Sequence, residues 1–207
     1  LFAVGLGQSF AFVLVPPLAR DLGLSVIETS MIFSISAVAW AITSTSWGRA
    51  SDRHGRRNIA VIGLIGYSIS IIALITPLFL VEKNILDFIY LLPLLILGRL
   101  INGLIGSATR PAAFGYMADI TSRSKRTKKF ARLESSFLIG TIMGPMMGGF
   151  LFLYSKTLPF YIFAMCGFIA AIGIYVTFPN KISLKEKSEH IISKLSFKDK
   201  SVRPFLL

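Results

Sequence analysis

Six long apolar runs dominate this chain and limit what it can fold into. They cover about residues 1–19, 27–48, 59–80, 88–117, 133–154 and 158–178. A helix that crosses the hydrocarbon core of a bilayer needs about 20 mainly apolar residues, and these runs are too long and too continuously apolar for the strands of a membrane barrel. With 54% hydrophobic and only 15% charged residues, the chain also lacks the polar residues that cover a water-soluble domain. The sequence therefore predicts an all-α membrane protein with a bundle of six transmembrane helices over residues 1–178.

The charged residues predict how these helices are oriented. Lys and Arg in short loops stay on the cytoplasmic side of a membrane. Seventeen of the 22 Lys and Arg residues lie in the connections 49–58 and 119–132 and in the tail 179–207, whereas each of the three alternate connections holds one. We therefore expect an integral protein of the plasma (inner) membrane with both termini cytoplasmic. Residues 179–207 are expected to form a basic cytoplasmic linker.

The composition also excludes several partners and chemistries. Because the net charge of +12 arises from membrane topology, it indicates no nucleic-acid partner, and a secondary attraction to anionic membrane lipid is expected instead. Cys166 is the only cysteine, which excludes a disulfide-stapled domain. The sequence contains no nucleophile–base pair, phosphate loop or metal-ligand spacing. We therefore expect no enzyme activity, no cofactor and no metal site.

The connection after the second run carries a motif with a specific spacing. It reads Gly48-Arg49-Ala50-Ser51-Asp52-Arg53-His54-Gly55-Arg56-Arg57. Gly48 allows close helix approach, Gly55 permits the positive φ of a tight turn, and Asp52 can pair with the surrounding arginines or a helix N-terminus. A loop that only fixes topology needs the basic residues but neither the acid nor the glycines. This connection closely resembles the cytoplasmic signature between helices 2 and 3 of the major facilitator superfamily.

Two further segments resemble this superfamily, in the order that it has them. In the fourth run, Arg99-Leu100-Ile101-Asn102-Gly103-Leu104-Ile105-Gly106 resembles its Arg-x-x-x-Gly-x-x-Gly segment. In the fifth, Gly140-Thr141-Ile142-Met143-Gly144-Pro145-Met146-Met147-Gly148-Gly149 matches the segment Gly-x-x-x-Gly-Pro-x-x-Gly-Gly of its proton-coupled antiporters. The resemblance implies the N-terminal six-helix half of a major-facilitator fold, built as three plus three helices with an inverted repeat.

The resemblance also implies a function. It suggests a secondary active transporter of the drug:proton antiporter-like branch, which exports a small organic compound (a drug or a metabolite) in exchange for protons by alternating access. Its implied partner is a C-terminal six-helix half. The first run has no carboxylate, unlike several exporters of this branch, which leaves such an acid to the second half. The alternatives are a uniporter or a sugar or metabolite carrier of the same superfamily, and a non-transporting membrane scaffold or sensor.

The resemblance assigns a conformational switch to Gly48, Asp52, Arg53, Gly55, Arg56, Arg57 and Asp119. Within it, Asp119 is implied to pair with Arg53 or Arg56. Gly140, Gly144 and Gly148 recur every four residues and so line one helix face, where small residues let a neighbouring backbone come close. Pro145 removes a backbone donor and favours a bend. Ordinary helix packing is enough to explain these glycines together with Gly149. The resemblance implies in addition that this helix controls the direction in which substrate and protons are exchanged.

Polar and small residues inside the runs are candidates for a substrate and proton pathway. They are Gln8, Glu28, Arg99, Asn102, Gly103 and Gly106. Arg99 lies near mid-membrane, so it should face the bundle interior and pair with another group; the alternative is a structural anchor on backbone carbonyls. We expect Gln8, Arg99 and Asn102 on the face exposed toward the second half.

Two carboxylates near the ends of runs have a simpler interpretation. Ser25 and Glu28 fit a capping box, in which each side chain satisfies a backbone donor of the other residue. A proton site at Glu28 is the alternative. Glu134 begins the fifth run and is expected to be a carboxylate at a helix N-terminus.

Overall fold

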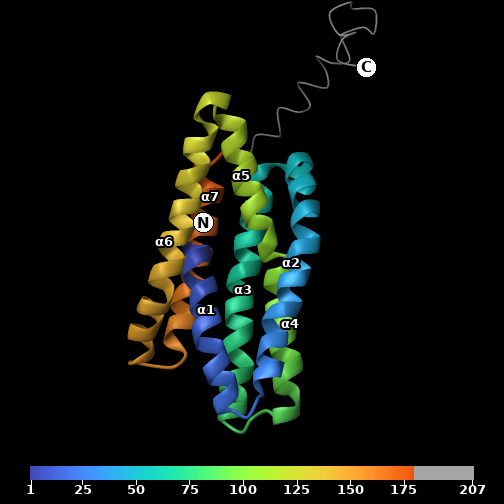
Figure 1. Cartoon of the computed structure of the whole chain (residues 1–207), viewed down its shortest axis with the longest axis vertical. Helices are drawn as coiled ribbons and strands as arrows, with labels where there is room; N and C mark the ends of the chain where they lie inside the picture. Colours follow the sequence, from blue (N-terminus) through green and yellow to red (C-terminus); the bar gives the residue numbers. More distant parts are fainter. Residues whose placement is uncertain (180–207) are drawn as a thin grey trace, which may run out of the picture.

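The computed structural model describes residues 1–179 as a bundle of long helices (Figure 1), so the expected linker, apart from Pro179, lies outside the described residues. The helices are α1 (Phe2–Asp21), α2 (Val26–His54), α3 (Arg56–Glu82), α4 (Leu91–Leu104), α5 (Thr109–Ile120), α6 (Arg126–Phe152) and α7 (Leu158–Thr177). Single 3-10 turns precede α4, join α4 to α5 and precede α6, at Phe88–Tyr90, Gly106–Ala108 and Arg123–Lys125.

The described residues contain six segments that are long and apolar enough to cross a membrane. Four are single helices. The fourth span consists of the turn at Phe88–Tyr90, α4, the turn at Gly106–Ala108 and α5, and the fifth consists of the turn at Arg123–Lys125 and α6. The prediction of six membrane helices is therefore confirmed. α2 and α6 continue beyond their apolar runs into charged sequence, because a helix can extend past the hydrocarbon core into a region where water solvates its side chains.

The structure differs from the sequence expectation in the fourth span, where one continuous helix was expected over 88–117. α4 ends at Leu104, and α5 begins only at Thr109. Side chains of α2 bond the carbonyls freed at this break: the Thr43 hydroxyl lies 2.9 Å from the Gly103 oxygen, and the Trp47 indole donates to the Leu104 oxygen at 2.5 Å. Neighbouring helices can satisfy a broken membrane helix in this way. The break is therefore built into the bundle.

The pairing of the helices agrees with an inverted repeat. α1 packs along α6, α2 along α4, and α3 along both α7 and α4. A repeat that places spans one to three on spans four to six exchanges α1 with α4 and α6 with α2. The α1–α6 pair then corresponds to the α4–α2 pair, and the α3–α7 pair corresponds to itself. This pairing fits the six-helix half of three plus three helices that the sequence predicted.

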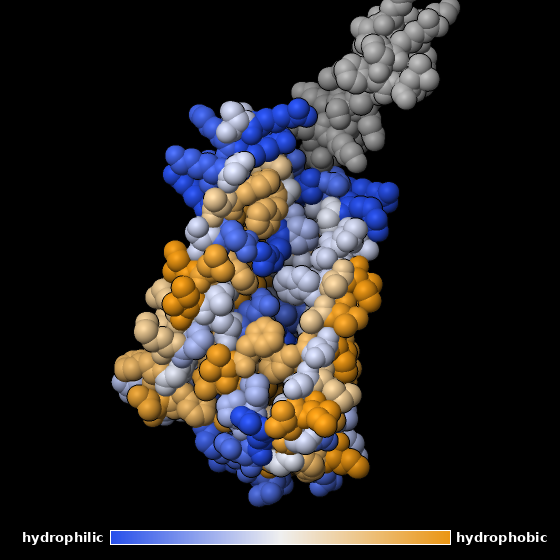
Figure 2. Space-filling view, viewed as in Figure 1, coloured by the Kyte–Doolittle hydropathy of each residue, from blue (hydrophilic) through white to orange (hydrophobic). Residues whose placement is uncertain are grey.

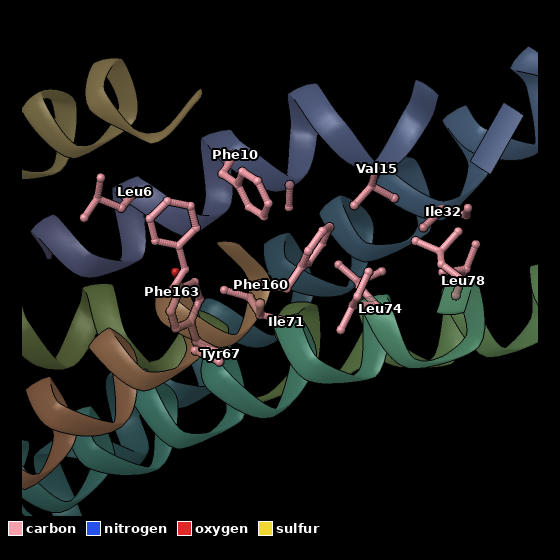
Figure 3. Close-up of a cluster of buried hydrophobic side chains, with 14 of the residues drawn as sticks. Leu6, Phe10, Val15, Ile32, Tyr67, Ile71, Leu74, Leu78, Phe160 and Phe163 are labelled. Atoms are coloured by element: carbon pink, nitrogen blue, oxygen red, sulfur yellow. The ribbon is translucent and has the colours of Figure 1, made fainter. Parts of the chain in front are cut away.

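The hydrophobic core lies where α1, α3 and α7 meet (Figure 3). Phe10 of α1 contacts Phe160 and Phe163 of α7 edge-to-face, with ring centroids 4.7 and 4.8 Å apart. Tyr67 of α3 is almost fully buried beside them, and its hydroxyl donates to the Ala3 carbonyl at 2.8 Å. Buried aromatic pairs of this geometry add to the stability that area burial provides. This core fixes α1 against the rest of the bundle.

Apolar side chains cover much of both sides of the bundle in the face seen in Figure 2. Large apolar side chains such as Ile42, Ile142 and Val176 are mostly exposed, and soluble monomers rarely expose large contiguous apolar patches. The two ends are hydrophilic, and hydrophilic and neutral side chains run down the middle of the face seen in Figure 2. We call the end that carries the α2–α3 and α5–α6 connections the basic end. The chain is an integral membrane protein.

Candidate functional site

A charged network centred on Arg56 holds α2, α3 and α5 together at the basic end. Arg56 forms an ion pair with Asp52, and its Nε donates to Asp119 Oδ2 at 3.0 Å. Its Nη1 donates to Ser51 Oγ at 2.7 Å, and only 12% of its side chain is exposed. Of the two arginines left open as partners of Asp119, the structure pairs it with Arg56. Because this largely enclosed guanidinium pairs with one carboxylate from α2 and one from α5, its charge-assisted hydrogen bonds hold the three helices together.

The other residues of the signature surround this network. Gly55 has φ +91 between the ends of α2 and α3, a conformation that favours glycine. Arg57 donates to the carbonyl oxygens of Tyr175 and Phe178, which ties α3 to the end of α7. Arg53 is exposed and forms no ion pair within residues 1–179. The structure thus gives the arginines of this motif different surroundings.

Arg99 lies inside the bundle, on α4, and its surroundings are aromatic. Only 3% of the residue is exposed, and its guanidinium carbon lies 5.1 Å from the ring centroids of both Phe12 and Phe33. Its Nε has no hydrogen-bond partner, and none of the ion pairs within residues 1–179 involves it. The interior position agrees with the sequence expectation. A buried cation usually pairs with a carboxylate or a carbonyl group, whereas Arg99 makes cation–π contacts with two phenylalanine rings.

The expected exposure of the polar pathway residues is wrong for two of them. Arg99 and Asn102 are each only 3% exposed, because α4 turns them toward the interior. Gly103 and Gly106 are buried as well, where Gly103 packs against Ser36 of α2. Gln8 is half-buried.

The two carboxylates near span ends have different outcomes. The capping box is confirmed: the Ser25 amide donates to Glu28 Oε2 at 2.8 Å, and the Glu28 amide donates to Ser25 Oγ at 3.2 Å. The expectation for Glu134 is wrong, because α6 starts at Arg126 and Glu134 lies two turns inside it. Its carboxylate accepts from Arg110 Nη2 at 2.7 Å with both oxygens, which ties α5 to α6.

The glycines of the antiporter-like motif form a seam between α6 and α1. A Cβ at Gly140 would collide with the Phe2 carbonyl oxygen, one at Gly144 with the Leu6 carbonyl oxygen, and one at Gly148 with the Phe10 ring. Gly149 has nothing within 4 Å of that position. α6 continues through Pro145 as one helix. Three of the four motif glycines therefore allow close helix contact.

Sequence reasoning missed several residues that shape this region. In the sequence, Phe12 and Phe33 look like ordinary apolar residues of two spans. The only indication of their role was that a buried arginine such as Arg99 must contact groups that stabilise its charge. Thr43 and Trp47 look like ordinary polar and aromatic residues of the second span.

No group of three or more His, Cys, Asp or Glu side chains within residues 1–179 lies close enough to hold a metal ion.

Comparison with known proteins then settles the family. The family model described as Major Facilitator Superfamily matches residues 1–206. This chain belongs to the major facilitator superfamily. It is 29% identical to the quinolone resistance protein NorA of Staphylococcus aureus over 172 residues, which cover 83% of this chain and 41% of that protein.

A second relative, the class B tetracycline resistance protein of Escherichia coli, is 31% identical over 159 residues. These residues cover 77% of this chain and 36% of that protein. The chain spans only about two-fifths of the length of the curated relatives that it matches.

Proposed function

We propose that this chain is one half of an exporter that moves a small organic compound out of the cell in exchange for protons. The observation that carries the proposal is the α6–α1 seam, in which a complete antiporter-type motif supplies three close contacts. Two relatives named for resistance to quinolones and to tetracycline support an organic compound as the substrate. The basic end is taken as cytoplasmic in the plasma membrane, with both termini on that side, because short basic loops stay inside.

The chain supplies one wall of the transport pathway in this proposal. The chain spans about two-fifths of its relatives' length, which supports a second six-helix half as its partner. The two halves rock about a binding site near the membrane midplane, as in other secondary transporters with internal repeats. In this proposal Gln8 on α1 and the buried Arg99 and Asn102 on α4 serve the pathway, and Glu28 marks the end opposite the basic one.

The charged network at the basic end acts as the conformational switch. Arg56 joins α2, α3 and α5 into one unit, so the helices at this end move together rather than separately. Gly55 shapes the connection that holds this unit, whereas Gly48 lies inside α2 and a Cβ there would meet only Pro111, at 3.9 Å. Arg53, which forms no ion pair within residues 1–179, is assigned to contacts with the second half. The proton-binding acid is assigned to that half, because α1 carries no carboxylate before Asp21.

Transport by the complete protein in proteoliposomes tests this proposal. With an acidic interior, we expect uptake of a quinolone or of tetracycline into vesicles that hold inside-out transporter, and loss of uptake when a protonophore removes the gradient. Uptake that ignores the proton gradient would identify a uniporter. No gradient-driven uptake of any organic compound, from well-folded protein, would contradict the proposal and favour a scaffold or sensor.

A further inference from the structure

A hollow of about 410 Å³, open to the surface, lies between the second half of α1 and the first half of α2. Its lining combines aromatic, hydroxyl and basic side chains with no carboxylate: Phe12, Pro16, Arg20, Val26, Thr29, Ser30, Phe33 and Ser34. Volumes of a few hundred Å³ suit small organic molecules. Arg20 is the only charged residue of this lining, so the hollow itself is basic.

Phe12 and Phe33 separate the hollow from a second cation. The two rings are stacked, with centroids 4.7 Å apart and planes 28° apart. Arg99, on α4, lies 5.1 Å from both centroids and is itself hidden from the surface. Phe12 is 46% exposed, so its ring can rotate without disturbing the hydrophobic core.

Within residues 1–179, Arg99 lacks the partner that a buried cation requires. More than nine-tenths of the residue is buried, its Nε is without a hydrogen bond, and no carboxylate within residues 1–179 pairs with it. A cation–π contact compensates only part of the lost hydration of a guanidinium. An anion that reached Arg99 would gain a charge-assisted hydrogen bond, and Arg can form two such bonds with one carboxylate.

We infer that this hollow binds a planar aromatic compound that carries a carboxylate or a similar acid group. The aromatic part of the compound stacks on the Phe12–Phe33 pair, and its acid group pairs with Arg99 when the Phe12 ring turns aside. Arg20 at the rim attracts the same charge. A cationic compound is disfavoured, because it would meet two like charges, Arg20 at the rim and Arg99 behind the rings.

This inference rests on the proposed function, since it names the substrate class of that exporter, but its test needs no transport. Binding is measured by isothermal titration calorimetry on the complete transporter in lipid nanodiscs. The three probes share one ring system and differ in charge: 2-naphthoate, 2-naphthamide and 2-naphthylmethylammonium. We expect 2-naphthoate to bind at least tenfold more tightly than the amide, and the ammonium probe to bind most weakly.

Variants assign the contacts. Arg99→Gln should weaken 2-naphthoate binding about 30-fold or more, because a buried charge pair loses one partner, and should abolish the preference over the amide. Arg99→Lys should retain part of that preference, since the charge remains and the planar fork is lost. Phe12→Leu and Phe33→Leu should weaken both probes by about three- to tenfold, the loss expected for aromatic stacking.

The matched control is Phe79→Leu on α3. Phe79 is also partly exposed and also contacts a cation, Lys83, at 5.7 Å, but it lies outside the hollow. This variant should bind all three probes as the wild type does. Equal binding of the three probes by the wild type, tighter binding of the ammonium probe, or an unchanged preference in Arg99→Lys and Arg99→Gln would overturn the inference. If the proton-driven transport assay fails while these binding differences hold, the exporter proposal is wrong and the acid-binding site stands.

Discussion

Arg56 and Arg99 show two ways in which this bundle holds a guanidinium. Arg56 has two carboxylates and a serine hydroxyl around it, whereas Arg99 has two phenylalanine rings and an unpartnered Nε. The motif spacing predicted the first environment, because Asp52 and the arginines share one connection. The second could not be predicted, since Phe12 and Phe33 lie on other spans and look like any other apolar residue in a hydropathy pattern. Of these two arginines, Arg99 has no acid partner within residues 1–179 and is therefore the one that can still bind an anion.

At this scale, we predict that the signature arginines differ in their contribution to stability. Arg56→Gln leaves Asp52 and Asp119 without their cation, and should destabilise the bundle by about 1–3 kcal/mol, as for loss of a charge-assisted hydrogen bond. Arg53→Gln is the matched control, because Arg53 is exposed and forms no ion pair within the described part of the chain. Thermal unfolding of the detergent-solubilised chain should show a lower Tm only for Arg56→Gln. Equal Tm values for the two variants would mean that the network is not a structural tie.

Hydropathy predicts where the membrane spans lie, but packing between helices determines where the helix of the fourth span is interrupted. Apolar runs of about 20 residues predicted the six spans, because only such runs match the bilayer core. The break between α4 and α5 was not predictable, since Gly103 and Gly106 lie in an apolar stretch that reads as one helix. The true start of α6 at Arg126 was missed for a different reason: charged residues end the hydropathy signal, but not the helix. This is why Glu134 forms an ion pair with Arg110 instead of capping a helix.

The α6–α1 seam gives a prediction for single methyl groups. Gly144→Ala places a Cβ against the Leu6 carbonyl oxygen and should destabilise the bundle by about 1–3 kcal/mol, the usual cost of overpacking. Gly149→Ala meets nothing within 4 Å and should be neutral or stabilise by up to about 1 kcal/mol, because alanine favours a helix over glycine. Tm values of the two variants measure the difference. A Gly144→Ala protein as stable as Gly149→Ala would show that the seam is loosely packed.

The helix break gives a second prediction at this scale. Thr43→Val removes a hydroxyl that lies 2.9 Å from both the Gly103 carbonyl oxygen and the Ser107 hydroxyl, and 2.8 Å from the Ala39 carbonyl oxygen of its own helix. Loss of its contacts to the fourth span should destabilise the bundle by about 0.6–1.7 kcal/mol, the range for polar contacts between membrane helices. Thr76→Val is the control, because the Thr76 hydroxyl bonds only the Ile72 carbonyl of its own helix, at 2.8 Å. Hydrogen exchange of the amides around residues 105–108 should also quicken in Thr43→Val. Unchanged exchange there would mean that α2 does not support the break.

The whole molecule is a bundle that has, on the face seen in Figure 2, a polar middle between apolar sides. Its exposed apolar side chains suit lipid, while the hydrophilic middle of one face (Figure 2) does not. The motifs predicted the fold of this molecule from three short segments, because each fixes a contact between helices rather than one helix alone. They did not predict the hollow between α1 and α2, which depends on how the two helices diverge. We expect the second half to cover this face in the working transporter.

Substrate uptake by reconstituted vesicles, with and without the second half, tests the central claim most directly. The 207-residue chain is reconstituted alone, and in parallel with a separately expressed C-terminal six-helix half of the same transporter, into vesicles with an acidic interior. We predict that the chain alone inserts and gives no uptake above empty vesicles, because it supplies one wall of the pathway, and that the two halves together give uptake that a protonophore abolishes. Proton-driven uptake by the chain alone would contradict this account and would identify a symmetric dimer or a complete small transporter.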